Sequence, residues 1–523
     1  MATPQEKLAA SLQTLNRLQA RGVTAIRSRD LSRTHRERLL GSGFLREVIK
    51  GWYIASRPDE TPGDSTAWYS SFWDFCASYL SARFGEEWCL SPQQSLALHA
   101  GNRTVPAQLL VRTPHGDNKP TPLPHNTSLL DVRHAMPPDG EVAVRDGLRL
   151  FSVPSALVAV SEQHFRRAAT DVRVAMASVK DASDVLAVLL EGGRSTVAGR
   201  LAGAFRNAGN ARIADDILQT METAGYDVRE SDPFLDRPGI VLPVRELSPY
   251  VNRLRLMWDA MRAPVLEGFP APPGAVEPSS YLRAVDDVYI NDAYHSLSIE
   301  GYRVSPELIE RVRSGAWNPD GEPQDRENRD ALAARGYYDA FSAVKASLER
   351  VLHRENPGAV GRDDHGGWYR RLFGPSVTAG IVGAADLAGY RSGQVYIRHS
   401  MHVPPPREAV RDCMPALFEM LEAEAEPAVR VVLGHFVFVY IHPYRDGNGR
   451  MGRFLMNVML AADGYPWTII PVERRDDYMA ALESASVNQN IRPFASFIGD
   501  LAASALPVAR ASTRRPSDDG GGG

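Results

Sequence analysis

The longest strongly apolar stretch of the chain lies near Val431 to Ile441, in its C-terminal half. The run extends back to Ala428, and a length of fourteen residues favours a buried helix over a strand. It is far shorter than the roughly 20 residues that a membrane-spanning helix needs. A second apolar segment, Phe454 to Asp463, ends at Gly464, and glycine is a common signal for the end of a helix. The pattern therefore predicts two buried helices that flank residues 442–453.

The N-terminal part of the chain predicts three helices and a small hairpin. A helix is expected over residues 5–20 and a short one near residues 28–31, and a third follows Ser32, a good N-cap residue. The segment Phe44 to Ile54 predicts two short strands about a turn. This order is typical of a winged helix-turn-helix, whose third helix enters the major groove of DNA. A small helical module with a solvated basic face fits the same pattern equally well.

Most of the remaining pattern is helical, so the expected fold class is mainly α. Alanine-rich segments from about Val153 to Ala224 show no chemistry and predict a scaffold. Prolines within Gly268 to Ser280 argue against a helix there, and helices resume at Tyr281. The predicted domains are residues 1–58 (winged helix-turn-helix), 59–230 (α+β scaffold), 231–280 (linker and first helix), 281–505 (an all-helical domain with a small β-hairpin) and 506–523 (a polar, disordered tail).

Composition narrows the class of protein. A chain of 523 residues with 44% hydrophobic and 23% charged residues predicts a globular protein of several domains. Its net charge of -4 gives no overall preference for polyanions. Cys76, Cys89 and Cys413 are widely spaced and form no C-x-x-C pattern, which argues against a disulfide framework and a zinc site. Because the first twenty residues lack an apolar leader, we expect a cytoplasmic protein with no membrane partner.

Positive charge is concentrated near the N-terminus. From Arg17 to Lys50 there are nine Lys and Arg residues against three acidic residues, a net charge of +6. The third predicted helix carries Arg33, Arg36 and Arg38, which are the residues expected to contact DNA phosphates.

A glycine-rich stretch after the long apolar run has the character of a phosphate site. Gly447, Asn448 and Gly449 stand at a predicted helix N-terminus, where backbone N–H groups and the helix dipole attract anions. Arg450 and Arg453 lie three residues apart on the first turn of that helix, so both guanidinium groups can clamp one oligophosphate.

Two further residues complete the predicted chemistry. Asp446 suits Mg²⁺, which usually takes one or two carboxylates and completes its shell with phosphate oxygens and water. His442 is the candidate general base, because an ordinary histidine can accept a proton at neutral pH. Together they indicate a nucleotide with its metal.

The stretch HPYRDGNGRMGR also contains G-x-G-x-x-G, the dinucleotide fingerprint of hydride-transferring enzymes. That fingerprint requires the glycines directly at the end of a strand. Here the five residues His442 to Asp446 intervene, and the preceding apolar run is long for a strand. A Rossmann site is therefore the less favoured alternative.

The segment from His442 to Arg453 resembles the signature of the Fic (Fido-domain) family, H-P-F-x-[D/E]-G-N-G-R-x-x-R, with Tyr444 in place of Phe. Fic enzymes are mostly helical and mostly transfer AMP from ATP to protein hydroxyl groups. The resemblance implies that His442 deprotonates a Ser, Thr or Tyr hydroxyl and that Asp446 holds Mg²⁺. It also implies that the glycine nest, Arg450 and Arg453 hold the phosphates. Transfer of UMP or phosphocholine is left open.

Two other segments resemble parts of a Fic domain. Residues 389–406, with alternating Val395 and Ile397, predict a β-hairpin similar to the Fic flap, which borders the nucleotide and pairs with an extended target segment. An ordinary surface hairpin is the alternative. The segment that begins at Tyr478 resembles the helix near the adenine, but Ser486 stands where some members have Asn. Selectivity for adenine is therefore left open.

Ser296-Leu-Ser-Ile-Glu300-Gly301 resembles the inhibitory motif of self-inhibited Fic proteins, [S/T]-x-x-x-E-[G/N]. Ser296 and Glu300 are four residues apart and therefore share one face of a helix expected over about residues 286–300. The resemblance implies that Glu300 pairs with Arg453 in the place of the γ-phosphate. An ordinary ion pair at a helix end is the alternative.

The N-terminal half resembles AbiEi-type antitoxins and regulators, through LLGSGFLREVIKGWYIASRP and CLSPQQSLALHAG followed by VPAQLLVRTP. The predicted function is thus a self-inhibited protein adenylyltransferase that uses ATP and Mg²⁺ and modifies another protein or itself. The alternative is a DNA-binding regulator whose Fic domain senses nucleotide, modifies itself or removes AMP. A homodimer is compatible with either function.

Overall fold

One apolar helix organises the C-terminal half of the protein in its computed structural model. This helix, α18 (Pro427–Ile441), is buried along nearly its whole length. A helix that is hydrophobic on all sides must be surrounded by protein. It packs against the equally buried α19 (Asn448–Ala462) in a single large hydrophobic cluster. The two helices predicted on either side of residues 442–453 are confirmed, and no strand precedes the glycines.

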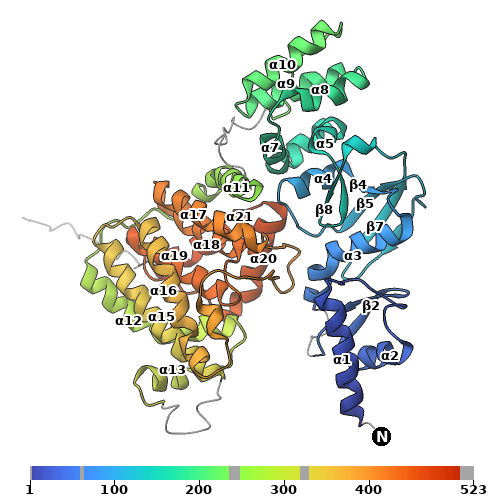
Figure 1. Ribbon diagram of the computed structural model, residues 1–523. Helices are drawn as coiled ribbons and strands as arrows, with labels where there is room; N and C mark the ends of the chain where they lie inside the picture. The colour runs from blue at the N-terminus through green and yellow to red at the C-terminus, as the bar shows by residue number, and fades with distance from the viewer. Residues whose placement is uncertain (1–2, 59–63, 235–247, 318–328, 507–523) are drawn as a thin grey trace, which may run out of the picture.

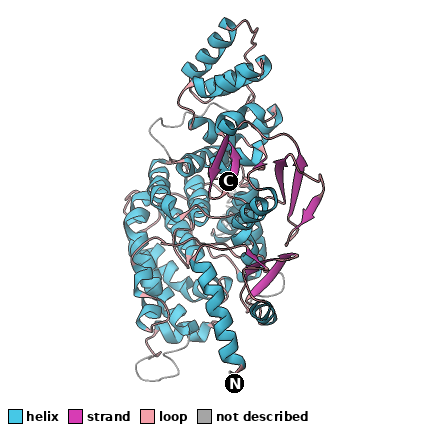
Figure 2. Cartoon of the chain, turned by 45° about the vertical axis from the view of Figure 1, so that its right-hand side comes forward, coloured by secondary structure: helices cyan, strands magenta, loops and turns pink. Residues whose placement is uncertain are grey.

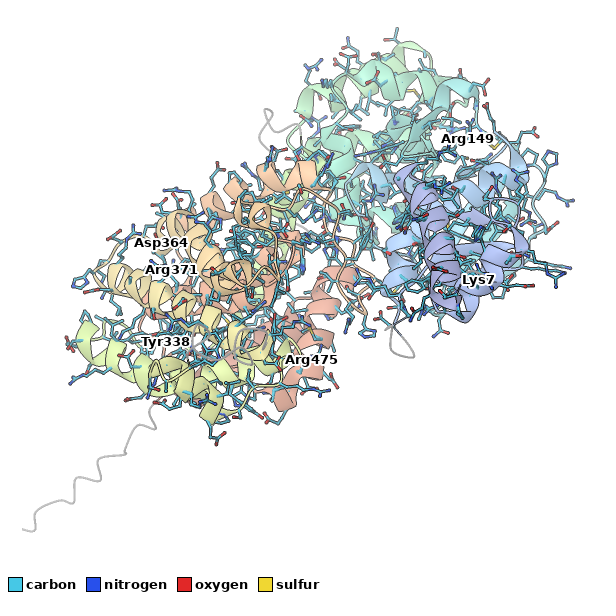
Figure 3. The ribbon with its side chains drawn as sticks, turned by 60° about the horizontal axis from the view of Figure 1, so that its bottom comes forward. Lys7, Arg149, Tyr338, Asp364, Arg371 and Arg475 are labelled. Atoms are coloured by element: carbon cyan, nitrogen blue, oxygen red, sulfur yellow. The ribbon has the colours of Figure 1, made fainter. Side chains whose placement is uncertain are left out.

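The structure describes residues 3–58, 64–234, 248–317 and 329–506. Figure 1 shows an N-terminal lobe, coloured blue to green, beside a helical C-terminal lobe, coloured green to red. All the strands of the described residues lie in the N-terminal lobe, as the magenta arrows of Figure 2 show. In Figure 3, Lys7 and Arg149 mark this lobe, and Asp364 and Arg475 mark the other. The expected fold class, mainly α, is confirmed.

The C-terminal lobe packs its other helices around the α18–α19 pair. Two long helices, α15 and α16, lie against each other and against α19. The helices around this pair are α11 (Pro249–Leu266), α12 (Pro278–Ile299), α13 (Pro306–Arg313), α15 (Arg329–Leu352), α16 (Pro357–Thr378), α17 (Arg407–Ala423), α20 (Arg475–Asn488) and α21 (Arg492–Ala505), with the short 3-10 helices η2 (Ala384–Leu387) and η3 (Val472–Arg474).

The first module of the N-terminal lobe has its own small hydrophobic cluster, which includes Leu15, Leu39 and Tyr53. Its three strands form an antiparallel sheet in the order β1-β3-β2. The first helix, the Ser32-capped helix and the hairpin are present as predicted. The elements are α1 (Pro4–Ala20), β1 (Ile26–Arg27), α2 (Arg33–Gly41), β2 (Leu45–Ile49) and β3 (Trp52–Ala55).

The prediction of a short helix near residues 28–31 is wrong. The chain there forms β1 and then a turn, in which Asp30 Oδ2 accepts a hydrogen bond from Arg27 N at 2.8 Å. The N–H of Ser28 donates to the Gly51 carbonyl at 3.0 Å. Pairing with the hairpin and the local carboxylate thus satisfies backbone groups that a helix would have used.

The rest of the N-terminal lobe combines two small sheets with a helical array. The larger sheet has the order β4-β5-β7-β6, with β5 and β7 parallel, and the smaller is the hairpin β8-β9. The elements are α3 (Thr66–Phe84), β4 (Cys89–Leu90), α4 (Pro92–His99), β5 (Gln108–Thr113), β6 (Pro120–Pro122), β7 (Ser128–Arg133), η1 (Asp139–Glu141), β8 (Val142–Arg145), β9 (Leu148–Phe151), α5 (Val153–Ala159), α6 (Glu162–Arg167), α7 (Ala169–Ala177), α8 (Ala182–Glu191), α9 (Ser195–Asn207) and α10 (Ala211–Thr223).

The two lobes meet where α7 packs against α11. At this junction Arg253 of α11, which is buried, forms an ion pair with Asp171 of α7. The Nε group of Arg253 also donates to the hydroxyl of Tyr440 at 2.9 Å. Since Tyr440 lies on α18, this buried arginine joins the N-terminal lobe to the helix at the centre of the other lobe.

The structure bears on some of the element boundaries that the sequence predicts. Helix α12 begins at Pro278, three residues before the expected start at Tyr281, because proline is well accepted in the first turn of a helix. Residues 235–247 of the predicted linker and 507–523 of the predicted tail lie outside the described residues. Within the described ranges, no helix is both long and apolar enough to cross a lipid bilayer.

The contact between α15 and α16 depends on Gly336, because a Cβ there would overlap the carbonyl oxygen of Leu372. We expect Gly336→Ala to force the helices apart and to lower the free energy of unfolding by about 1–3 kcal/mol. Hydrogen exchange followed by mass spectrometry should then be faster in peptides from both helices. Gly367→Ala on α16 is the matched control, since a Cβ there meets nothing within 4 Å. Equal exchange in the two variants would contradict the close approach.

Candidate active site

His442 stands at the point where α18 ends. It caps the helix in the left-handed conformation, with φ of 53°, and Pro443, which follows, cannot continue an α-helix hydrogen-bond ladder. Left-handed backbone is unusual for a residue with a Cβ and persists only where surrounding contacts hold it. Here Arg391 supplies such contacts: its Nε donates to the His442 carbonyl at 2.8 Å and its N–H to the Pro443 carbonyl at 2.9 Å.

The imidazole of His442 has a defined tautomer. Its Nδ1 lies 3.2 Å from the carbonyl oxygen of Val439. A carbonyl oxygen can only accept, so Nδ1 carries the proton and Nε2 keeps its lone pair. Burial lowers the pKa of His442 to about 4, although the Val439 carbonyl and the charges of Glu300 and Asp446 oppose this change. At neutral pH the ring is therefore uncharged and Nε2 can accept a proton.

The loop after His442 is held from beneath by aromatic and amide groups. Tyr444 is 1% exposed and stacks on Tyr369, with ring centroids 3.8 Å apart. The side chain of Asn448 donates to the Tyr444 carbonyl at 2.9 Å and accepts from its N–H at the same distance. Asn448 is predicted to bind the cofactor, but its side-chain amide forms hydrogen bonds within the loop. Its backbone is the part that is available to a ligand.

The residues predicted to form an anion cradle come together at the N-terminus of α19. Gly447 adopts φ of 78° as the N-cap and has no side chain to cap the first turn. Arg450 and Arg453 project from that turn and are 1% and 4% exposed. Arg450 Nε and Arg453 Nη1 are buried without a hydrogen-bond partner among the described residues. Two buried cations with unsatisfied N–H groups beside a helix N-terminus favour a bound oligophosphate.

Glu300 occupies this cradle. Its Oε1 accepts a hydrogen bond from Arg453 Nη2 at 2.8 Å, and a Cβ added to Gly449 would collide with it. Burial by itself would raise the pKa of Glu300, but the charges of Arg453 and Arg450 prevail and lower it, so the carboxylate is ionised at neutral pH. The pairing of Glu300 with Arg453 expected from the sequence is present in the structure.

Helix α12 places the carboxylate of Glu300 beside Arg453. Arg453 Nε donates to Ser296 Oγ at 2.9 Å, and Arg453 Nη2 donates to the Ser296 carbonyl at 3.0 Å. Glu300 is the C-cap of the helix, and Gly301, with φ of 86°, lets the chain turn away. Ser296 and Glu300, which share one face of α12, therefore both accept hydrogen bonds from the guanidinium group of Arg453.

Sequence reasoning missed Asp292, one turn before Ser296 on α12. It is buried and accepts a hydrogen bond from the Tyr337 hydroxyl at 2.6 Å. Burial raises the pKa of Asp292 to about 6, although hydrogen bonds and the charge of Arg453 oppose the rise. The spacing 292, 296, 300 on one helix face was a signal for it, but only the packing of α15 supplies its partner.

Residues 389–406 contain no strand in the structure, so the predicted β-hairpin is wrong. Side chains rather than a ladder hold this segment, which we call the flap loop. Arg391 donates from Nη1 to the Gly393 carbonyl at 3.0 Å, and Glu483 accepts from the N–H of Met401 at 2.8 Å. The prolines at 404–406 have no N–H to pair. Val395 and Ile397, predicted to border the nucleotide, are partly exposed in this loop.

Tyr478 and Asp446 differ in exposure. Tyr478, predicted to lie near the adenine, is 1% exposed, and its hydroxyl lies 2.7 Å from Nε2 of the buried His435. It is therefore part of the core. The Asp446 side chain, by contrast, keeps 60% of its exposure, with Oδ1 3.9 Å from Arg450 Nη2. Its carboxylate is open to an incoming cation.

The residues expected to bind DNA lie together on α2, far along the chain from this site. Arg33 is exposed and pairs with Glu37 at 2.7 Å. Arg36 donates to the Ser28 carbonyl at 3.0 Å, and Arg38 donates to the Lys7 carbonyl at 2.8 Å. Two of the three arginines thus help to hold the module together.

Comparisons with known proteins bear on the helical lobe. Residues 368–460 match the family model described as Fic/DOC family. Proteins named protein adenylyltransferase Fic are similar over part of the chain: 31% identity over 44% of this chain and 43% of the protein from Drosophila mojavensis, and 30% identity over 44% of this chain and 51% of that from Nematostella vectensis. The chain thus spans about half the length of these relatives.

Solved structures are also similar. Fic-1 (residues 134–508) from C. elegans matches with 19% identity and a TM-score of 0.36, over 66% of this chain and 96% of that one. A Fic family protein from Desulfovibrio desulfuricans matches with 22% identity and a TM-score of 0.34, over 50% of this chain and 75% of that one.

The protonation state of the partly buried His442 can be tested by NMR. We expect its imidazole to stay neutral as the pH falls to about 4, with the proton on Nδ1, because burial disfavours the imidazolium. A titration of histidine-labelled protein would follow the ring nitrogen and carbon shifts, and His442→Asn would identify the signals by their loss. A midpoint above pH 6, or a proton on Nε2, would contradict the assignment.

Proposed function

We propose that this protein transfers AMP from ATP to a hydroxyl group of a protein side chain, because residues 368–460 match the Fic/DOC family model. The observation that carries the proposal is the meeting of a neutral His442 with a cradle of two buried arginines at the start of α19. A proton acceptor and a phosphate-binding site on one short loop are what phosphoryl-group transfer to a hydroxyl requires.

In the proposed reaction, Nε2 of His442 takes the proton of a Ser, Thr or Tyr hydroxyl. The hydroxyl oxygen forms a bond to the α-phosphorus of ATP, and the bond from that phosphorus to the oxygen bridging to the β-phosphate breaks. Pyrophosphate leaves, and AMP stays on the protein. A histidine with a lowered pKa is a weak base, so positioning and charge neutralisation supply most of the acceleration.

The residues present fit a nucleotide with its metal. Arg450 Nε and Arg453 Nη1, which lack partners among the described residues, are available to phosphate oxygens. Asp446, whose side chain is 60% exposed, would hold Mg²⁺. When bound, Mg²⁺ neutralises phosphate charge and usually needs no more than one or two carboxylates from a protein.

Glu300 acts in this proposal as a built-in inhibitor. Its carboxylate places one negative charge where phosphate oxygens would bind, and its pKa is lowered, so the charge persists at neutral pH. ATP can bind only if its phosphates displace Glu300 or bind without the contact to Arg453. Either way, the chain competes with the nucleotide for one guanidinium.

Labelling with radioactive ATP and Mg²⁺ tests both roles. We expect Glu300→Gly to increase AMP incorporation, into the protein itself or into an added acceptor, because the competing carboxylate is gone. Adding His442→Ala to this variant should reduce incorporation by about 10²-fold or more, the usual contribution of a general base.

Glu300→Gln is the matched control, because it keeps the size of the side chain and removes the charge. An intermediate rise would separate the effect of charge from that of bulk. Equal labelling of Glu300→Gly with and without His442→Ala would contradict the role of His442. Mass spectrometry of the product identifies the group transferred, and a mass increase other than that of AMP would contradict adenylylation.

DNA binding by the N-terminal module is a second candidate function, supported by the net charge of +6 between Arg17 and Lys50 and by the exposed α2. Of the expected contacts, Arg33 is the one whose side chain is mostly exposed, at 83%. Its ion pair with Glu37 is a surface pair and therefore weak, so a phosphate can replace the carboxylate.

A random duplex DNA and the full chain suffice to test this second function. We expect binding that weakens by about 10³-fold or more between 50 and 200 mM salt if six or more phosphates are contacted. Arg33→Ala should weaken binding without unfolding the module, whereas Arg36→Ala and Arg38→Ala should also destabilise it because they lose hydrogen bonds to backbone carbonyls. Binding that is absent, or insensitive to salt, would contradict the proposal.

A further inference from the structure

The second arm of the flap loop, residues 396–403, packs in part against the N-terminal lobe. The carbonyl of Met401 accepts a hydrogen bond from Val105 N at 2.9 Å. Val403 is 6% exposed and belongs to the hydrophobic cluster of α3, on which Tyr396 and Met401 also pack. The lobe thus takes up Tyr396, Met401 and Val403, whereas Arg398 and His399 stay exposed.

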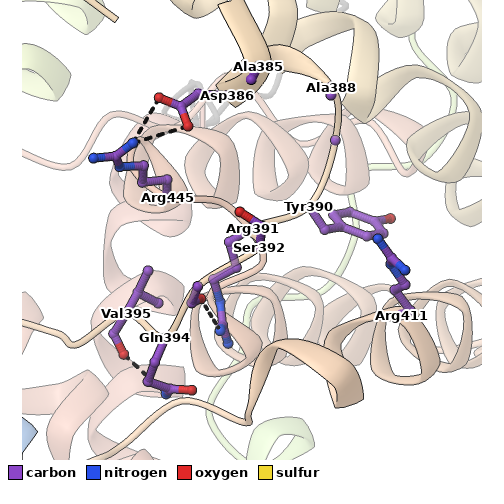
Figure 4. A pocket seen from close by; sticks show the side chains of 12 residues that line it. Ala385, Asp386, Ala388, Tyr390, Arg391, Ser392, Gln394, Val395, Arg411 and Arg445 are labelled. Carbon is purple, nitrogen blue, oxygen red and sulfur yellow. Dashed lines mark hydrogen bonds and ion pairs between the residues drawn. The ribbon is translucent and has the colours of Figure 1, made fainter. Parts of the chain in front are cut away.

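The first arm of the flap loop, residues 389–395, instead borders an open pocket of about 670 Å³. Figure 4 shows this pocket between the flap loop, η2 and α17. Its base is continuous with the catalytic loop, because Arg391 donates from its N–H to Pro443 and from Nε to the His442 carbonyl. Arg445 of the catalytic loop also lines the pocket, so a chain lying there would border the loop that carries His442.

The pocket is positively charged. Its lining includes Arg391, Arg411 and Arg445, with Asp386 as the one acidic side chain among the lining residues that the structure describes. Burial lowers the pKa of Arg391 to about 10, so it is charged at neutral pH, but its N–H groups are used by backbone carbonyls. The two other arginines are the ones that can meet a ligand.

Arg411 and Arg445 are available in different ways. Arg411 is exposed on α17, beside Tyr390 in Figure 4, and forms no ion pair within the described ranges. Arg445 pairs with Asp386 at 3.0 Å, and its side chain keeps 72% of its exposure. An exposed pair of this kind contributes little, so Arg445 can exchange Asp386 for another carboxylate at small cost.

We propose that this pocket binds the segment of the target protein that carries the modified hydroxyl, and that Arg411 and Arg445 select targets with Asp or Glu beside that hydroxyl. The inference rests on the proposed adenylyl transfer and adds the chemical class of the acceptor sequence. The first arm is the part of the flap loop that lines this pocket.

Two acceptor peptides that differ only in charge test the pocket. Each contains one Thr, flanked by Glu in one peptide and by Lys in the other, and each is offered with ATP and Mg²⁺ to the full-length Glu300→Gly protein. We expect about five-fold faster labelling of the Glu peptide, since an exposed charge pair is worth up to about that factor, and the preference should shrink at high salt. Arg411→Glu, added to the same protein, should abolish or invert the preference.

The matched control is Arg311→Glu on α13, an exposed arginine outside the pocket, which should keep the preference. Equal labelling of the two peptides, or a preference unchanged by Arg411→Glu, overturns the inference. If the protein labels itself but neither peptide, fluorescence anisotropy with the two peptides decides the question, and equal binding overturns it. If self-labelling is absent, the proposed transfer has failed, and the anisotropy still reports the charge preference of the pocket separately.

Discussion

A guanidinium as deeply buried as that of Arg453 is stable only with an anion beside it. The structure meets this requirement with Glu300, and α12 is held against α19 by the same contact through Ser296. The N-terminus of α19 adds backbone N–H groups that also favour an anion. A site built in this way binds either a carboxylate of the chain or a phosphate of a ligand. Each anion excludes the other because both pair with the guanidinium group of Arg453.

The burial that makes Arg453 dependent on an anion also determines the state of His442. Loss of water around the imidazole lowers its pKa, while the contact from Nδ1 to Val439 directs the Nε2 lone pair away from the backbone. In a site of low polarity, electrostatic interactions are stronger than they are in water. The neutral base and the paired ions are therefore consequences of one environment, formed where α18 ends and α19 begins.

The N-terminal lobe contributes to this environment from outside. Arg253 joins Asp171 of that lobe to Tyr440 of α18, and the cluster around α3 contacts the second arm of the flap loop. The lobe thus packs against one part of the flap loop.

The sequence by itself determined the features that depend on local spacing. The all-apolar run predicted α18, the glycines and arginines that follow it predicted the cradle, and the four-residue interval placed Ser296 and Glu300 on one helix face. Short-range hydrogen bonding and helix periodicity carry such information, since they involve residues close in the chain.

Only the tertiary structure decided which groups far apart in the chain would become partners. Ser28 pairs with the hairpin, and residues 28–31 form no helix. The flap loop is held by Arg391 and Glu483 rather than by a strand ladder. The burial of Asp292 against Tyr337 likewise depends on how α12 and α15 pack. A backbone N–H or a carboxylate can be satisfied by many partners, and the choice among them follows from the packing of the whole chain rather than from the neighbouring residues.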